Sequence, residues 1–176
     1  PTELWSQICQ SSFYSQRGSV ISLTSIIGNK KPGLFLDDRN LLMSLKIKLF
    51  KYEATGNSFI LFDNRKRVFP PEKLIKNSLV GQLCTKENGF STDGVILLEE
   101  SQDFDFKMRT INADGTEVEM CGNGLRAICH YAYFEVKIPI DNCYRVETLN
   151  GVYNGFIEEG GSVKVQMTEL FDIGKK

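Results

Sequence analysis

Alternation of apolar and polar residues, the pattern typical of half-buried strands, recurs along most of this chain. It is clear in 46–54 (KIKLFKYEA) and resumes in 58–63 (SFILFD) after a Thr-Gly-Asn break. These segments are predicted to form a hairpin, or two strands joined by a functional turn. Similar patterns predict further strands in 93–101, 104–112, 143–149, 150–159 and 162–170. The chain is therefore expected to be rich in strands.

Two segments show the three- and four-residue spacing of a helix instead. Residues 70–86 open on prolines and repeat apolar side chains at helical intervals. A second helix is predicted from about Gly124 to Val136, ended by Pro139, with one apolar face made of Leu125, Ile128, Cys129, Ala132 and Val136. Many strands and few helices together predict an α+β fold.

The beginning of the chain differs from the rest. Residues 1–42 contain turn-like stretches (GNKKPG, DDRN) and no motif that indicates chemistry, whereas the regular patterns start just after Met43. We therefore predict an amino-terminal extension of unknown role at 1–42, followed by a folded lobe.

Composition and charge narrow the class of protein. The 176 residues are 41% hydrophobic, enough for one globular core or for one domain and part of another. The 21 Lys and Arg nearly balance the 22 Asp and Glu, without a block of one sign, which disfavours nucleic acid or an anionic membrane as the partner. No apolar run approaches the ~20 residues that span a bilayer, and residues 1–28 lack the core of a signal peptide. A cytoplasmic protein with a small-molecule or protein partner is expected.

Cysteine usage argues against a disulfide framework or a zinc site. The five cysteines are odd in number, form no CxxC pair and are accompanied by one histidine, His130. In a reducing compartment they would be free thiols, most of them buried as small hydrophobic residues.

One cysteine has a distinctive setting. Cys121 directly precedes Gly-Asn-Gly and the predicted helix, where the first backbone N–H groups have no carbonyl partner and the helix dipole favours negative charge. Thiolates are favoured at such positions. Gly122 and Gly124 would let a ligand approach the backbone, and the N–H groups would suit a carboxylate. From spacing alone, however, a buried structural cysteine beside an ordinary Gly-Asn-Gly turn is the more common case, and the spacing by itself favours that reading.

Three stretches resemble the motifs of diaminopimelate epimerases. INADGTEVEMCGNGLRA is similar to the family's N-A-D-G segment leading into M-C-G-N-G-x-R at a helix start. FKYEATGNSFILFD resembles its opening strand, G-x-GN turn and aspartate, and STDGVILL resembles its G-x-G-A-D-G segment. The resemblance extends from about Met43 to Glu169.

The resemblance implies an isomerase that interconverts LL- and meso-diaminopimelate, in lysine and peptidoglycan precursor biosynthesis, without pyridoxal phosphate or metal. It also implies two pseudo-symmetric lobes, each a mostly antiparallel sheet wrapped around a central helix, with one cysteine at each helix mouth. Inversion at carbon needs acid–base groups on both faces of the α-carbon, here a thiolate and a thiol. By position, Cys121 would be catalytic, and Asn57, Asn112, Gly122 and Asn123 would bind the substrate. Asp63, Asp93, Asp114 and Arg126 also match motif positions, and structural bracing is expected of them.

The second catalytic cysteine of the family has no counterpart. Cys129 is about 12 Å along the helix axis from Cys121, too far to face it across one carbon, and the remaining cysteines lack a C-G-x-G context. We therefore predict an amino-terminal lobe at 43–148 and a truncated start of the carboxy-terminal lobe at 149–176. That second lobe would come in cis or in trans, this chain alone would be inactive, and a homodimer is a possible assembly.

Smaller departures and rival readings accompany the resemblance. Lys86, Ser91 and Ser58 stand where the family has arginine, glycine and an acidic residue, which suggests a divergent member. A proline racemase or hydroxyproline epimerase resembles M-C-G-H-G at this position, against Asn123 here. A phenazine-biosynthesis-type isomerase would lack the cysteine base. A non-catalytic fragment or interaction module is the alternative from another class.

Overall fold

The computed structural model describes residues 14–22, 46–67, 71, 79–85 and 90–167, of which 14–22, 46, 47 and 79 are described by their backbone alone. The strands in this part of the chain are β1 (Tyr14–Ser22), β2 (Lys46–Ala54), β3 (Asn57–Asp63), β4 (Gly94–Glu99), β5 (Phe106–Asn112), β6 (Glu117–Val118), β7 (Tyr144–Thr148), β8 (Gly151–Ile157) and β9 (Val163–Gln166). Two α-helices, α4 (Leu79–Cys84) and α5 (Gly122–Tyr131), accompany them. None of the helices described here is long and apolar enough to cross a membrane.

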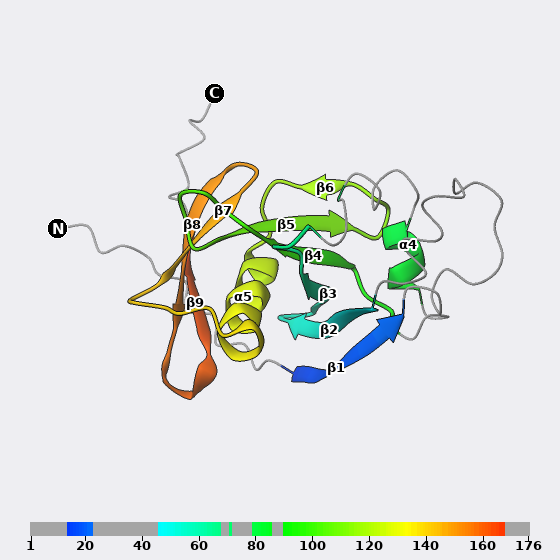
Figure 1. Ribbon diagram of the computed structural model, residues 1–176, viewed down its shortest axis with the longest axis horizontal. Coiled ribbons are helices and arrows are strands. Elements are labelled where there is room, and N and C mark those ends of the chain that lie inside the picture. Colours follow the sequence, from blue (N-terminus) through cyan, green and yellow to red (C-terminus); the bar gives the residue numbers. More distant parts are fainter. Residues whose placement is uncertain (1–13, 23–45, 68–70, 72–78, 86–89, 168–176) are drawn as a thin grey trace, which may run out of the picture.

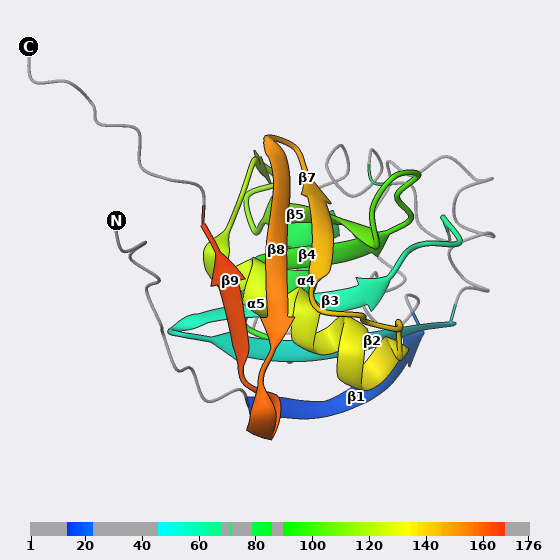
Figure 2. The same cartoon turned by 90° about the vertical axis from the view of Figure 1, so that its left-hand side faces the viewer.

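All nine strands belong to one sheet in the order β1-β2-β3-β4-β5-β7-β8-β9, with β6 paired to β5. The pairs β3/β4 and β5/β7 are parallel, and every other pair is antiparallel. Each parallel pair needs a crossover, and the second one carries α5. Figures 1 and 2 show that the sheet curls around α5, so that both the β2–β3 side and the β8–β9 side approach the helix. The predicted α+β lobe, a mostly antiparallel sheet around a central helix, is confirmed.

Residue alternation decides which face of the sheet meets α5. In β5, Phe106 and Met108 belong to the core around the helix, whereas Lys107 and Arg109 point to the other face. The predicted hairpin is also confirmed, because β2 and β3 pair antiparallel with Ala54 opposite Asn57.

The central helix buries the face that its spacing predicted. Leu125, Ile128 and Cys129 are fully buried, and the helix continues past Tyr131 as one π-helical turn, η1 (Ala132–Val136). Lys137 ends it in the left-handed conformation, with φ of 62°. The helix starts two residues before the predicted Gly124, because Cys121 caps it.

Strand β8 passes very close to this helix. A Cβ built on Gly155 would lie 2.4 Å from the Sγ of Cys129, so only glycine allows the strand to approach the helix here. This contact places Cys129 in the core, as predicted.

The sheet is also covered on its outer face. Val80 and Leu83 of α4 are buried, α4 packs against β4 and β5, and Val95 and Leu97 of β4 are fully buried without belonging to the core around α5. Residues 70, 72–78 and 86 of the predicted helix at 70–86 lie outside the described residues.

The predicted domain boundaries remain predictions. Most of the predicted extension, 1–13 and 23–42, lies outside the described residues, and its one described segment, β1, pairs with the edge of β2. Strands β8 and β9, beyond residue 148, continue the same sheet as β7.

Candidate active site

Cys121 is the N-cap of the central helix. Its backbone is extended (φ −136°, ψ 112°), and its carbonyl accepts the first helical hydrogen bond from the Leu125 N–H at 2.8 Å. Its Sγ accepts the N–H of Gly124 at 3.3 Å. The sulfur of a partly exposed cysteine therefore lies among the unpaired amide donors of the first turn, where the helix dipole favours negative charge.

The glycine at the third helical position allows this geometry. Gly124 is buried, and a Cβ on it would lie 3.0 Å from the Cδ1 of Ile96 and 3.3 Å from the Cβ of Cys121. A side chain here would push the helix away from β4 or displace the thiol. At Gly122, a Cβ would make only ordinary contact with Met167, at 3.6 Å. The two glycines thus serve different purposes: Gly124 allows close packing, and Gly122 leaves the helix start uncovered by a side chain of its own.

Asn57 and Asn123, both predicted from the family resemblance as substrate-binding residues, are brought together by the fold. The Nδ2 of Asn123 donates to the Oδ1 of Asn57 at 2.8 Å, although the two residues are 66 positions apart. Asn57 begins β3 after a two-residue turn in which Thr55 (φ 48°) and Gly56 (φ 86°) are both left-handed, the geometry of a tight hairpin. The hairpin therefore places Asn57 beside the first turn of α5.

A network of hydrogen bonds fixes the strand ends around this hairpin. The carboxylate of Asp93 accepts the Ser58 N–H at 2.7 Å, and the Asp93 N–H donates back to the Ser58 carbonyl at 2.9 Å. The Ala113 N–H donates to the Asp93 carbonyl at 2.9 Å, which ties in the end of β5. A Cβ on Gly94 would lie 2.5 Å from the Ile111 carbonyl oxygen, so the strands meet closely at this point. Asp93 makes the bracing contacts expected of it.

Asn112 is the last residue of β5, and its side chain bonds to the turn that follows the strand. Its Nδ2 donates to the Thr116 Oγ1 at 3.1 Å, and the same hydroxyl donates to the carboxylate of Asp114 at 2.6 Å. The hydrogen bonds from the Thr116 hydroxyl and from the Thr116 N–H hold the pKa of Asp114 below its usual value. In the described part of the chain, no hydrogen bond joins Asn112 to Cys121, Asn57 or Asn123. The predicted substrate contact of Asn112 stays a prediction.

Arg126, for which the sequence predicted only structural bracing, is a neighbour of the site. Its Nη1 donates to the Oδ1 of Asn123 at 3.2 Å. Spacing gives a partial signal for this contact, because residues three apart on a helix are neighbours. The onward contact to Asn57 depends on the tertiary fold.

The other described cysteines differ from Cys121. Burial raises the pKa of the Cys129 thiol and of the Cys84 thiol, so both favour the neutral form. Cys143 is partly buried and caps no helix. Cys9 lies outside the described residues.

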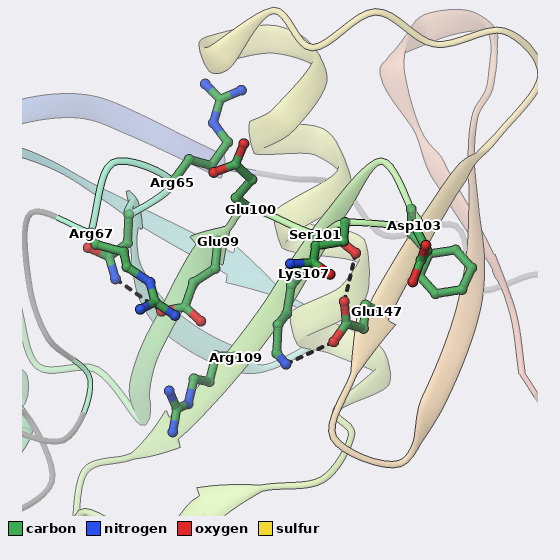
Figure 3. A pocket seen from close by; sticks show the side chains of 12 residues that line it. Arg65, Arg67, Glu99, Glu100, Ser101, Asp103, Lys107, Arg109 and Glu147 are labelled. Carbon is green, nitrogen blue, oxygen red and sulfur yellow. Dashed lines mark hydrogen bonds and ion pairs between the residues drawn. The ribbon is translucent and has the colours of Figure 1, made fainter.

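A charged depression of about 510 Å³ lies elsewhere on the molecule. Figure 3 shows its lining side chains. They come from the ends of β3 and β4 remote from Asn57 and Gly94, from the segment between β4 and β5, from the face of β5 that points away from α5, and from Glu147 of β7. Lys107 pairs with Glu147 at 2.8 Å, and Ser101 donates to the same carboxylate at 2.7 Å. Two further lining cations, Arg65 and Arg109, pair with the carboxylates of Asp63 and Glu117.

Comparison with known sequences decides the family. The model of the family described as diaminopimelate epimerase matches residues 49–171, a span that contains Cys121 and the four predicted substrate-binding residues. The chain belongs to the diaminopimelate epimerase family. Curated relatives named diaminopimelate epimerase include those of Flavobacterium psychrophilum, 37% identical over 127 residues, and Nostoc punctiforme, 40% identical over 128 residues.

The similarity to these diaminopimelate epimerases covers only part of each relative. It includes 72% of this chain and 48% of the Flavobacterium protein, and 70% of this chain and 44% of the Nostoc protein. The chain thus spans about half the length of the curated relatives it matches.

Solved structures of other families share the fold. A phenazine biosynthesis protein of the PhzF family from Bacillus anthracis superimposes with a TM-score of 0.52 at 19% identity, over 68% of this chain and 39% of that one. A hydroxyproline epimerase from Agrobacterium vitis gives 0.50 at 14% identity, over 68% and 41%. At such low identity these structures support the epimerase-like fold alone.

Proposed function

We propose that this chain supplies one catalytic lobe of a diaminopimelate epimerase, with Cys121 as one of two thiol acid–base groups that invert the α-carbon. The observation that carries the proposal is the position of the Cys121 sulfur, 3.3 Å from the Gly124 N–H at the start of α5, in a chain of this family. The reaction would need neither pyridoxal phosphate nor a metal, and it would serve lysine and peptidoglycan precursor synthesis.

The chemistry requires a thiol that can hold or release a proton. A thiolate at Cys121 would be stabilised by the Gly124 N–H and by the positive end of the helix dipole, and it would take the α-proton from one face of the substrate. A protonated group on the opposite face would then deliver a proton to the carbanion. The second group would come from another lobe, in cis or in trans, and this chain without it would not complete the inversion.

The helix start also suits the substrate's α-carboxylate. The first turn of α5 contains no acidic residue, its backbone N–H groups point toward an incoming anion, and Gly122 adds no side chain of its own there. A carboxylate bound at Gly122 and Asn123 would place the α-carbon beside Cys121. Asn57 and Asn112 would hold further polar groups of the substrate.

Substrate binding can be tested on this chain directly. Reduced protein is alkylated with iodoacetamide with and without LL-diaminopimelate, and the modification of each cysteine is followed by peptide mass spectrometry. We expect diaminopimelate to slow the modification of Cys121 and to leave Cys143, the matched reference thiol, unchanged. Equal slowing at both thiols would indicate a nonspecific effect and would contradict the proposal.

Catalysis requires an assembly with both lobes. Residues 46–167 would replace the matching segment of the Flavobacterium psychrophilum relative, and the chimera would be incubated with LL-diaminopimelate in deuterated water. We expect α-deuteration and formation of the meso isomer in the chimera and in its C143A variant, and neither in the C121A variant. Exchange that persists in C121A would refute the role of this thiol.

A further inference from the structure

Arg126 occupies a position on α5 that helix stability does not explain. A cation near a helix N-terminus opposes the dipole, and the first turn here offers no acidic residue to compensate. Within the described part of the chain Arg126 forms no ion pair, and its buried Nε–H has no hydrogen-bond partner. Its Nη1 donates a hydrogen bond to the Oδ1 of Asn123, at 3.2 Å.

This hydrogen bond determines the direction of the next one. A guanidinium only donates, so Asn123 must present its carbonyl oxygen to Arg126 and its NH₂ group to Asn57. Asn57 must then accept through its Oδ1, at 2.8 Å. The side-chain NH₂ of Asn57 is left pointing away from this chain of hydrogen bonds, and among the described residues it has no acceptor.

We propose that Arg126 is a positioning residue that fixes the direction of the Arg126–Asn123–Asn57 hydrogen-bond chain, so that Asn57 presents a donor to the substrate. This inference rests on the proposed function only in taking Asn57 as a substrate contact. A donor at Asn57 favours a substrate carboxylate or carbonyl oxygen and disfavours an ammonium group. The residue that sets this preference touches no substrate.

The hydrogen bond between Asn123 and Asn57 could also run in the opposite direction, from Asn57 to Asn123, and Arg126 excludes that arrangement. If the Asn123 amide flipped, its NH₂ would face the guanidinium donors, and Asn57 would have to flip as well and show its oxygen outward. Hydrogen bonds from a charged donor are stronger than those between neutral groups, so the arginine favours one arrangement of both amides. Without the charge, the two arrangements become similar in energy.

The experiment is side-chain amide NMR on the full, isotopically labelled chain. Exchange of the Asn123 side-chain amide protons with water is measured in the wild-type protein, in R126K, which keeps a charged donor, and in R126M, which keeps only the bulk. The control is R145M, which removes an exposed guanidinium that lies over the ring of Phe104, away from the chain of hydrogen bonds. We expect about tenfold faster exchange in R126M, equivalent to ~1.4 kcal/mol, and little change in R126K and R145M.

A second variant tests the direction itself. The carboxylate introduced by N123D can only accept, so Asn57 should turn around and donate to it, and the side-chain amide of Asn57 should become protected from exchange. A folded R126M with wild-type protection of Asn123, or a folded N123D in which the Asn57 amide stays exposed, would overturn the proposal.

The same spectra separate this inference from the proposed function. Diaminopimelate is titrated into the wild-type chain while the Asn57 and Asn123 amides are monitored. If the variants behave as expected and diaminopimelate moves neither amide, the positioning role of Arg126 stands and the proposed substrate is wrong. If diaminopimelate shifts both amides and R126M shows wild-type exchange, the proposed function is supported and the role of Arg126 is refuted.

Discussion

Replacing Cys121 by serine should remove the proposed chemistry and keep, or improve, the stability of the fold. Cys121 serves two purposes at once, because its sulfur is both the proposed acid–base group and the acceptor that caps α5 through the Gly124 N–H. Serine is a preferred N-cap residue, and its hydroxyl can accept the same hydrogen bond. Alanine cannot accept it. The two variants therefore differ mainly in the cap.

The size of the difference follows from the capping geometry. Loss of an N-cap acceptor costs about 1 kcal/mol, within a range of about 0.5–2 kcal/mol. Both variants remove the same sulfur from its contact with the core, so that loss cancels in the comparison. We expect C121S to be about 1 kcal/mol more stable than C121A, which corresponds to a thermal midpoint about 2–4 °C higher in a chain of this size.

The assay is urea unfolding followed by circular dichroism, with thermal melting as a second measurement. The matched control is the pair C143S and C143A, since Cys143 lies before β7 and caps no helix, and these two should differ by less than about 0.5 kcal/mol. Equal stability of C121S and C121A would refute the capping argument. In the two-lobe chimera, C121S should lose α-proton exchange despite its stability.

Two further predictions concern Cys129 and His130, which lie further along α5. G155A should destabilise the chain by about 1–3 kcal/mol, because the new methyl group would lie 2.4 Å from the Cys129 sulfur. In urea unfolding, the double variant G155A/C129A should lose less unfolding free energy than the sum of the losses in the two single variants. Strict additivity would contradict the contact. Burial lowers the pKa of His130, the single histidine, below its ordinary value of 6.5. As the pH falls, the unfolded chain therefore binds a proton at this residue before the folded chain does, and the free energy of unfolding should decrease below about pH 6.5. Urea midpoints at pH 7.5, 6.5 and 5.5 measure this, and H130Q should reduce the slope; an unchanged slope would exclude His130 as its source.

Local patterns in the sequence carry much of the information about this fold. The alternation in 46–54 and 104–112 predicts strands β2 and β5 together with the faces that they bury, because successive side chains of a strand point to opposite sides. The spacing of Leu125, Ile128 and Cys129 predicts the buried face of α5 for the corresponding helical reason. The position of Cys121 at the start of the helix can be recognised from its immediate neighbours alone, because capping is a contact between residues a few positions apart.

Contacts between distant segments required the tertiary structure. The strand order, the parallel pairs β3/β4 and β5/β7, and the approach of Gly155 to Cys129 depend on how the sheet closes around α5, and an alternating pattern says nothing about which strand is the neighbour. The sequence marks Asn57, Asn123 and Arg126 separately, but only the packing of the β2–β3 hairpin against the helix start joins them. The direction of their hydrogen bonds, and hence the donor that Asn57 presents, is a property of that assembled geometry, because each amide can point either way until its neighbours are in place.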